Sequence, residues 1–159
     1  FNVAWLRALA RRGGGSPEIG RSIAIAGTIG ALALVLYTTF LGTQAPFSEF
    51  MRRIGIYFYF GASVIAQIML ARHTLTLSRT LGLHSVTRIG RVQMAIALVP
   101  FVLGVLNLVL KNTLEDPDPV ENIIEWIFAL LMHIYFVLTY FAWRDTGFSG
   151  RFDVDLDGR

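Results

Sequence analysis

The sequence contains no cysteine, and charged residues are scarce in it. Without cysteine, no disulfide framework, thiolate nucleophile or thiolate-ligated metal site can be built. Asp, Glu, Lys and Arg together make up 16% of the chain, against 54% for the hydrophobic residues. This balance is too apolar for an ordinary soluble domain of 159 residues and indicates a membrane protein.

Charge is missing altogether from four internal runs, residues 22–48, 54–71, 92–110 and 126–143. Each run is long enough to cross a bilayer, whose hydrocarbon core needs about 20 helical residues. None can be a cleaved secretory signal, because all four are internal. The sequence therefore predicts an all-α, polytopic transmembrane helix bundle with four spanning helices, at about residues 17–43, 54–73, 91–111 and 119–144.

The chain divides into three predicted parts. Residues 1–15 form the end of a preceding span or an interfacial helix, followed by a glycine linker. Residues 16–144 form the four-helix transmembrane domain, and residues 145–159 a polar cytoplasmic tail. Because the chain begins with Phe1 and not Met, we expect further residues upstream. The connection between Arg72 and Arg91, at about 17 residues, is long for a helix bundle and predicts a functional loop or an extra short helix.

Basic residues are distributed unevenly around the four predicted spans. If the N-terminal segment is cytoplasmic, only Arg52, Arg53 and Lys111 lie outside, while eleven arginines lie inside: Arg7, Arg11, Arg12, Arg21, Arg72, Arg79, Arg88, Arg91, Arg144, Arg151 and Arg159. This positive-inside bias predicts that both termini of the chain are cytoplasmic. It also explains the high pI without a nucleic-acid partner, because the charges sit at membrane boundaries.

Polar residues within the spans are the first candidates for a site. In the third span, Gln93, Ala97, Pro100, Gly104 and Asn107 share one face, and in the second span Gln67 lies beside a stripe of small residues. Such faces serve helix packing in membranes, where small residues allow close approach and polar residues bond across helices. The alternative is a groove for a lipid or substrate.

Glu125 and His133 are the ionisable residues that fall within or near the last span, where such groups usually mark a partner or a site. Glu125 can pair with Lys111 or another helix. His133 can be a neutral histidine bonded to a neighbouring helix, at a residue such as Gln67 or Asn107. Alternatively it handles protons or is an axial ligand of a haem or chlorophyll-type pigment. Trp126 and Trp143 bracket the span as aromatic interface anchors.

Catalytic and metal signatures are weak. The histidines and acids do not converge on one level, no Gly-x-Ser-x-Gly motif occurs, and no catalytic residue, metal site or cofactor is predicted. Asp153, Asp155 and Asp157 match the opening of a calcium-binding loop, but the chain ends before the loop's twelfth position. Whether the protein is an enzyme stays uncertain, with a non-enzyme favoured.

The order of features resembles the DRAM/FRAG/SFK family of six-span membrane proteins. The resemblance is carried by the opening Asn-Ile-Ile-Glu-Trp of the last span, residues 122–126, and by the aromatic residues that follow it: Phe128, Tyr135, Phe136, Tyr140, Phe141 and Phe148. It implies that the four spans here are the last four of six, and it implies tasks linked to membrane lipids and autophagy. No catalytic residue of that family can be carried over, and His133 has no counterpart in its pattern.

Three functions are compatible with these features. The first is a multi-pass membrane protein with a lipid-related or regulatory role, acting on or with membrane lipids. The second is an accessory subunit that packs on partner helices of a bioenergetic or photosynthetic complex. The third is an intramembrane lipid-remodelling enzyme. Arginine far outnumbers lysine, which suggests a GC-rich genome and a bacterial inner membrane.

Overall fold

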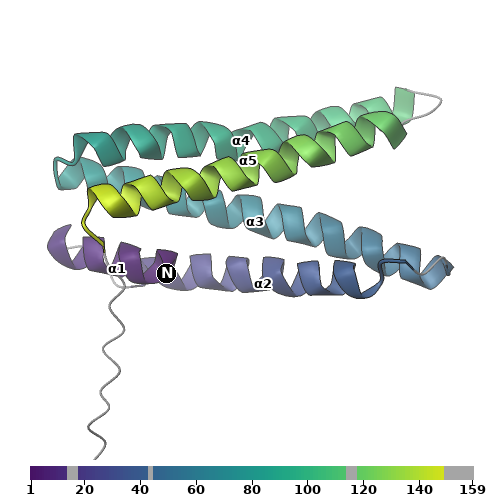
Figure 1. The fold of residues 1–159 in the computed structure, drawn as a ribbon, viewed down its shortest axis with the longest axis horizontal. Coiled ribbons are helices and arrows are strands. Elements are labelled where there is room, and N and C mark those ends of the chain that lie inside the picture. The colour runs from purple at the N-terminus through teal and green to yellow at the C-terminus, as the bar shows by residue number, and fades with distance from the viewer. Residues whose placement is uncertain (14–17, 43–44, 114–117, 149–159) are drawn as a thin grey trace, which may run out of the picture.

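The computed structural model describes residues 1–13, 18–42, 45–113 and 118–148. They form five helices: α1 Asn2–Gly13, α2 Ile19–Thr39, α3 Pro46–Thr80, α4 His84–Thr113 and α5 Asp118–Asp145 (Figure 1). The described ranges contain no strand. Helices α2 to α5 each contain a segment long and apolar enough to cross a membrane. The prediction of an all-α bundle with four helices of spanning length is therefore confirmed.

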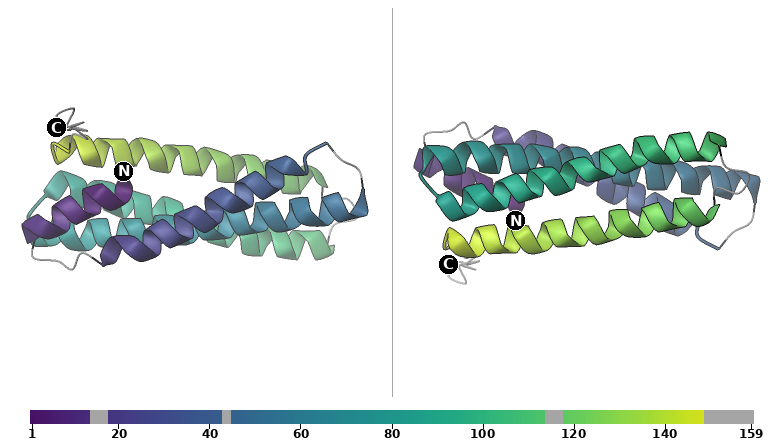
Figure 2. Two further views of the ribbon diagram at one scale, coloured as in Figure 1. Left: turned by 90° about the horizontal axis from the view of Figure 1, so that it is seen from below. Right: turned by 90° about the horizontal axis from the view of Figure 1, so that it is seen from above.

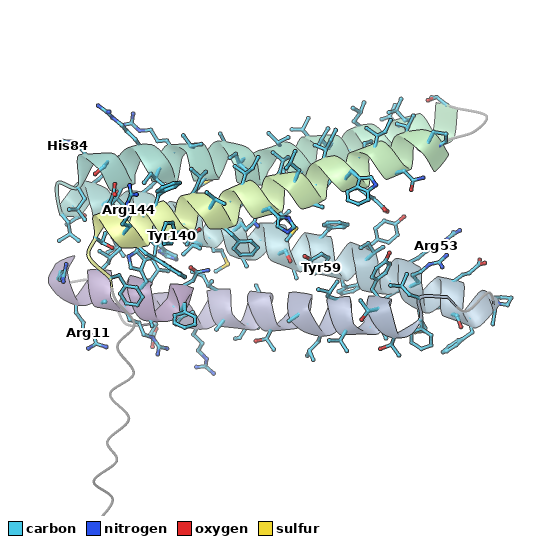
Figure 3. All side chains as sticks on the ribbon, viewed as in Figure 1. Arg11, Arg53, Tyr59, His84, Tyr140 and Arg144 are labelled. Carbon is cyan, nitrogen blue, oxygen red and sulfur yellow. The ribbon has the colours of Figure 1, made fainter. Side chains whose placement is uncertain are left out.

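The four long helices lie side by side in an elongated bundle, and the connections gather at its two ends (Figures 1 and 2). Helix α1 is short and runs beside the first part of α2 in the opposite direction (Figure 2). Arg11, His84 and Arg144 mark one end, and Arg53 lies toward the other (Figure 3). We call the first the arginine-rich end, because the end of α1, the start of α2, the α3–α4 turn and the end of α5 meet there.

Helix α1 is held to the bundle by one apolar face. Its residues Trp5, Leu6, Leu9 and Ala10 are almost completely buried, and the helix packs against α2 and α3. Its last turn carries Arg11 and Arg12, which favours helix formation because cations stabilise a helix C-terminus. The densest part of the core therefore lies at the arginine-rich end.

The connection between α3 and α4 differs from the prediction. Helix α3 continues to Thr80 and α4 begins at His84, so a three-residue turn replaces the expected connection of about 17 residues. Gly82 has φ +67°, a conformation that favours glycine, and the amide of Leu83 donates to the carbonyl of Ser78 at 2.8 Å. The prediction was wrong because the arginines end the apolar run without ending the helix.

At the opposite end of the bundle, α3 also extends beyond the predicted limit of its span. Helix α3 starts at Pro46, with Ala45 extended as its N-cap, so most of the connection expected between the predicted spans 17–43 and 54–73 is helical. Proline is favoured in the first turn, where its missing N–H needs no partner.

The polar face predicted for the third span is buried in its first half, whereas Gly104 and Asn107 farther along it are half-buried. Gln93 and Ala97 are completely buried and Pro100 is buried with them, whereas Val99 and Val102 on other faces are 40% and 64% exposed. Helix α4 is continuous through Pro100. The 4-3 spacing therefore identified correctly which side of this helix faces the bundle.

Candidate functional site

Two buried hydrogen bonds join α5 to the helices beside it. The side-chain amide of Gln93 donates to Thr139 Oγ1 at 2.9 Å, and the hydroxyl of Tyr135 donates to the backbone carbonyl of Gln67 at 2.7 Å. Gln93 was predicted as a position that could face a lipid or partner, but the structure places it inside the bundle. Its amide fastens α5 to α4.

A groove opens between the start of α1, the middle of α2, α3 and α5. We call it the central groove. Its volume is about 400 Å³, and its lining includes Asn2, Gly27, Ala31, Gln67, Met132 and Phe136. Phe136 is 56% exposed and Gly27 is exposed, so the groove reaches the lateral surface of the bundle. Figure 2 shows α5 set apart from α2 at this level, with the start of α1 between them.

The central groove contains two amide atoms that lack partners. Gln67 is only 6% exposed, and its Nε2 has no hydrogen-bond partner within the described residues. Asn2 Oδ1 is buried and unpartnered in the same way. A buried polar atom without a partner costs about 1–3 kcal/mol. The residues that line the groove therefore combine apolar walls with one donor and one acceptor that are buried and have no partner among the described residues.

A second groove lies on the lateral surface between α2 and α3, and we call it the α2–α3 groove. Its volume is about 650 Å³, and apolar or aromatic side chains form most of its lining: Ile25, Ile29, Tyr57, Phe58, Ile65 and Met69. Gly61 widens it, because a Cβ at that position would meet no atom within 4 Å. Apart from Tyr57 and Ser22, no polar side chain lines this groove.

Two exposed arginines extend the lining of the α2–α3 groove toward the arginine-rich end. Arg21 precedes Ile25 by one helical turn, and Arg72 follows Met69 by three residues. Residues three or four apart share a helix face. On both helices the face that lines the groove therefore continues to an exposed arginine.

His133 lies near the middle of the candidate span Asn122–Asp145 and is exposed on the surface of α5. Its Nδ1 is 2.6 Å from the backbone carbonyl of Ala129. A carbonyl only accepts hydrogen bonds, so Nδ1 is the donor, and in the neutral imidazole Nε2 is then an acceptor. The prediction that His133 bonds Gln67 or Asn107 was wrong, because a carbonyl of its own helix is within reach.

The remaining predicted positions are spread along the bundle. Glu125 and Trp126 are exposed near the start of α5, with Trp126 78% exposed, and Asn107 is half-buried on α4. The side chain of Lys111, the predicted partner of Glu125, lies outside the described residues. Six polar positions were predicted, and only Gln67 among them lines a groove.

Trp143 is not the exposed anchor that its place in the sequence predicted. It is half-buried, and its ring lies 6.1 Å from the ring of Phe1 and 6.1 Å from that of Phe148. The end of α5 therefore packs on the start of α1. Trp126 remains the exposed tryptophan of the pair.

The described residues contain no candidate metal-binding cluster. Among residues 1–13, 18–42, 45–113 and 118–148, no group of three or more His, Asp or Glu side chains is close enough to hold a metal ion. The calcium-loop fragment Asp153, Asp155 and Asp157 lies outside these ranges.

Comparison of the chain with protein-family models, with curated proteins and with solved structures gives no match. The resemblance to the DRAM/FRAG/SFK family stays a prediction.

Proposed function

We propose that this chain is a non-catalytic integral membrane protein with a lipid-related role, which binds an anionic phospholipid in the α2–α3 groove. The observation that carries the proposal is that the groove-lining faces of α2 and α3 both continue to an exposed arginine, Arg21 and Arg72. The apolar walls suit an acyl chain, while Arg21 and Arg72 suit a phosphate, which guanidinium groups bind through paired hydrogen bonds. The implied lipid task of the DRAM/FRAG/SFK family is consistent with this role.

The proposal includes an orientation. We place the arginine-rich end, and with it both ends of the chain, on the cytoplasmic side of a bacterial inner membrane. The positive-inside bias supports this choice, and the cytoplasmic leaflet supplies the anionic lipids that the arginines would bind.

Removing both arginines should weaken the binding of anionic lipid. In the double variant Arg21→Ala/Arg72→Ala, we expect the affinity for phosphatidylglycerol to fall by roughly tenfold or more, because each basic residue near an anionic headgroup contributes about 1 kcal/mol. Native mass spectrometry of the purified protein with added phosphatidylglycerol or phosphatidylcholine measures this. The binding of phosphatidylcholine should change little.

Arg88→Ala/Arg91→Ala is the matched control for that experiment. Both arginines are exposed on α4, which contributes no residue to the lining of the α2–α3 groove. The control deletes two positive charges, as the test variant does, and leaves the groove intact. An equal loss of affinity in the control, or no loss in Arg21→Ala/Arg72→Ala, would contradict a phosphate site beside this groove.

A second candidate function, an accessory subunit of a larger membrane complex, is favoured by His133. The imidazole is exposed near mid-span with an acceptor nitrogen, and hydrocarbon offers no donor to it. A helix of another subunit with a hydroxyl or amide at this depth would supply one. A pigment or haem iron could instead be bound by Nε2, since histidine ligands commonly donate their other ring N–H to a carbonyl.

His133→Leu tests this second function. If the chain belongs to a complex, we expect the fraction that migrates with it in mild detergent to fall about three- to tenfold, the effect of losing one hydrogen bond between membrane helices. Ile134→Leu, at an exposed position about 100° around the helix from His133, should have no effect. A wild-type chain that migrates alone would exclude the function, and a colourless wild-type preparation would exclude a pigment at His133.

A further inference from the structure

We propose that the central groove binds a neutral acylglycerol, a lipid with a free hydroxyl group and an ester carbonyl on a glycerol backbone. This goes beyond the anionic-lipid site, because it concerns a different cavity and an uncharged ligand. The volume of about 400 Å³ lies within the range of small-molecule sites, and it suits a glycerol headgroup with the first part of one acyl chain.

The two unpartnered amide atoms define what the ligand must carry. Gln67 Nε2 needs an acceptor and Asn2 Oδ1 needs a donor. An ester carbonyl supplies the acceptor and a hydroxyl supplies the donor. A plain hydrocarbon chain would fill the groove but would leave both buried atoms unpaired, at a cost that a polar headgroup removes.

The backbone of Gln67 is already fixed, which makes its side chain a well-placed donor. Its carbonyl accepts the hydrogen bond of Tyr135, a residue that is completely buried and also lines the groove. The position of Gln67 therefore does not depend on a ligand. A donor held in this way loses little conformational freedom when the ligand binds.

The central groove differs from the α2–α3 groove in the charge of the lipid that it suits. No side chain that lines the central groove is charged. A phosphate placed there would have no cationic side chain to compensate it, and burying such a charge in apolar surroundings is far more costly than burying a neutral polar group. The central groove therefore selects an uncharged lipid.

The walls explain how a lipid reaches Gln67. Gly27 and Ala31 on α2 and Ala66 on α3 leave the space that larger side chains would fill, and Phe136 forms an exposed rim on α5. The first turn of α1, with Asn2 and Val3, lines the groove toward the arginine-rich end (Figure 2). A lipid would thus enter sideways from the bilayer, between α2 and α5.

Photolabelling with a monoacylglycerol tests the proposal. The full chain is reconstituted in phosphatidylcholine vesicles with monoolein that carries a diazirine in its acyl chain, and labelled peptides are mapped. We expect labelling of the peptides that contain Gly27–Ala31 and Met132–Phe136. In Gln67→Met, which keeps the size of the side chain but removes the amide, the yield should fall about five- to tenfold, the effect of losing one hydrogen bond of about 1 kcal/mol or slightly more.

Two further variants keep the test decisive if Gln67→Met folds poorly. A Cβ at Gly27 would meet no atom within 4 Å, so Gly27→Leu can fill the groove without disturbing the helices, and it should abolish labelling. Gly61→Leu fills the α2–α3 groove instead and should leave labelling unchanged. A monoolein analogue with both hydroxyls methylated should compete at least fivefold less well than monoolein.

Two results would contradict the proposal of an acylglycerol in the central groove. Equal labelling of the wild type, Gln67→Met and Gly27→Leu would overturn the proposal. So would a photocrosslinker at Ala31 that captures a polypeptide helix in native membranes, since a helix would then occupy the groove. Binding of phosphatidylglycerol at Arg21 and Arg72 is measured separately and should be normal in Gln67→Met and Gly27→Leu, the two variants of the central groove. The failure of one proposal is therefore distinguishable from the failure of the other.

Discussion

Gly55→Leu is expected to separate α2 from α3 and to unfold the bundle in mild detergent. A Cβ at position 55 would lie 2.7 Å from the backbone N of Tyr37, 2.9 Å from its Cα and 3.0 Å from the carbonyl oxygen of Ala33. These are backbone atoms, so no side chain can rotate away to make room. Close approach of small residues is what holds helices together in a membrane, where no hydrophobic driving force does so.

The size of the effect should follow the size of the side chain. For Gly55→Ala we expect a loss of about 1–3 kcal/mol, the usual cost of overpacking, and for Gly55→Leu a larger loss. Thermal unfolding of the purified protein, followed by circular dichroism or by a dye that binds exposed apolar surface, measures both.

Gly27→Ala and Gly61→Ala are the controls. Both glycines lie in helices, and a Cβ at either would meet no atom within 4 Å. Alanine has a higher helix propensity than glycine, so these variants should be neutral or slightly more stable. If all three alanine variants lowered the melting temperature equally, the contact with Tyr37 would not be the cause.

The spans could be predicted from the sequence because charge is costly in hydrocarbon. The four charge-free runs therefore mark the helices that are long and apolar enough to cross a membrane: α3, α4 and α5 contain the runs 54–71, 92–110 and 126–143, and α2 contains the larger part of the run 22–48. The helix ends could not be predicted in the same way. Around Arg72 and Arg91 the chain leaves the apolar layer but keeps its backbone hydrogen bonds, and only Gly82 marks the turn.

The candidate site was predicted only in part, for a related reason. Spacing along one helix identified the buried face that contains Gln93, because that face depends on a single periodicity. Which helix a polar residue meets depends on how two elements approach, and spacing does not contain this information. His133 therefore turned out to bond its own helix, and the groove at Gln67 emerged only from the placement of α1 beside α5.

Trp5→Ala is expected to release α1 from the bundle. Trp5 is 1% exposed, and its indole N–H donates to Thr146 Oγ1 at 2.9 Å, which links α1 to the turn after α5. Replacing a buried tryptophan by alanine typically costs about 3–5 kcal/mol. Helix α1 has only 12 residues, and a helix this short is marginal without tertiary packing. Hydrogen exchange of the α1 amides in detergent should therefore rise strongly, while α3 and α4 stay protected.

Trp5→Phe separates packing from hydrogen bonding in that result. Phenylalanine keeps most of the buried ring and loses only the bond to Thr146, so we expect a loss of about 1 kcal/mol and little change in exchange. Unchanged protection of α1 in Trp5→Ala would mean that Leu6 and Leu9 hold the helix without the indole. Because Asn2 and Val3 line the central groove, a released α1 should also lower monoolein labelling, whereas binding of phosphatidylglycerol between α2 and α3 should persist. Helix α1 then serves as the wall of one lipid groove and is dispensable for the other.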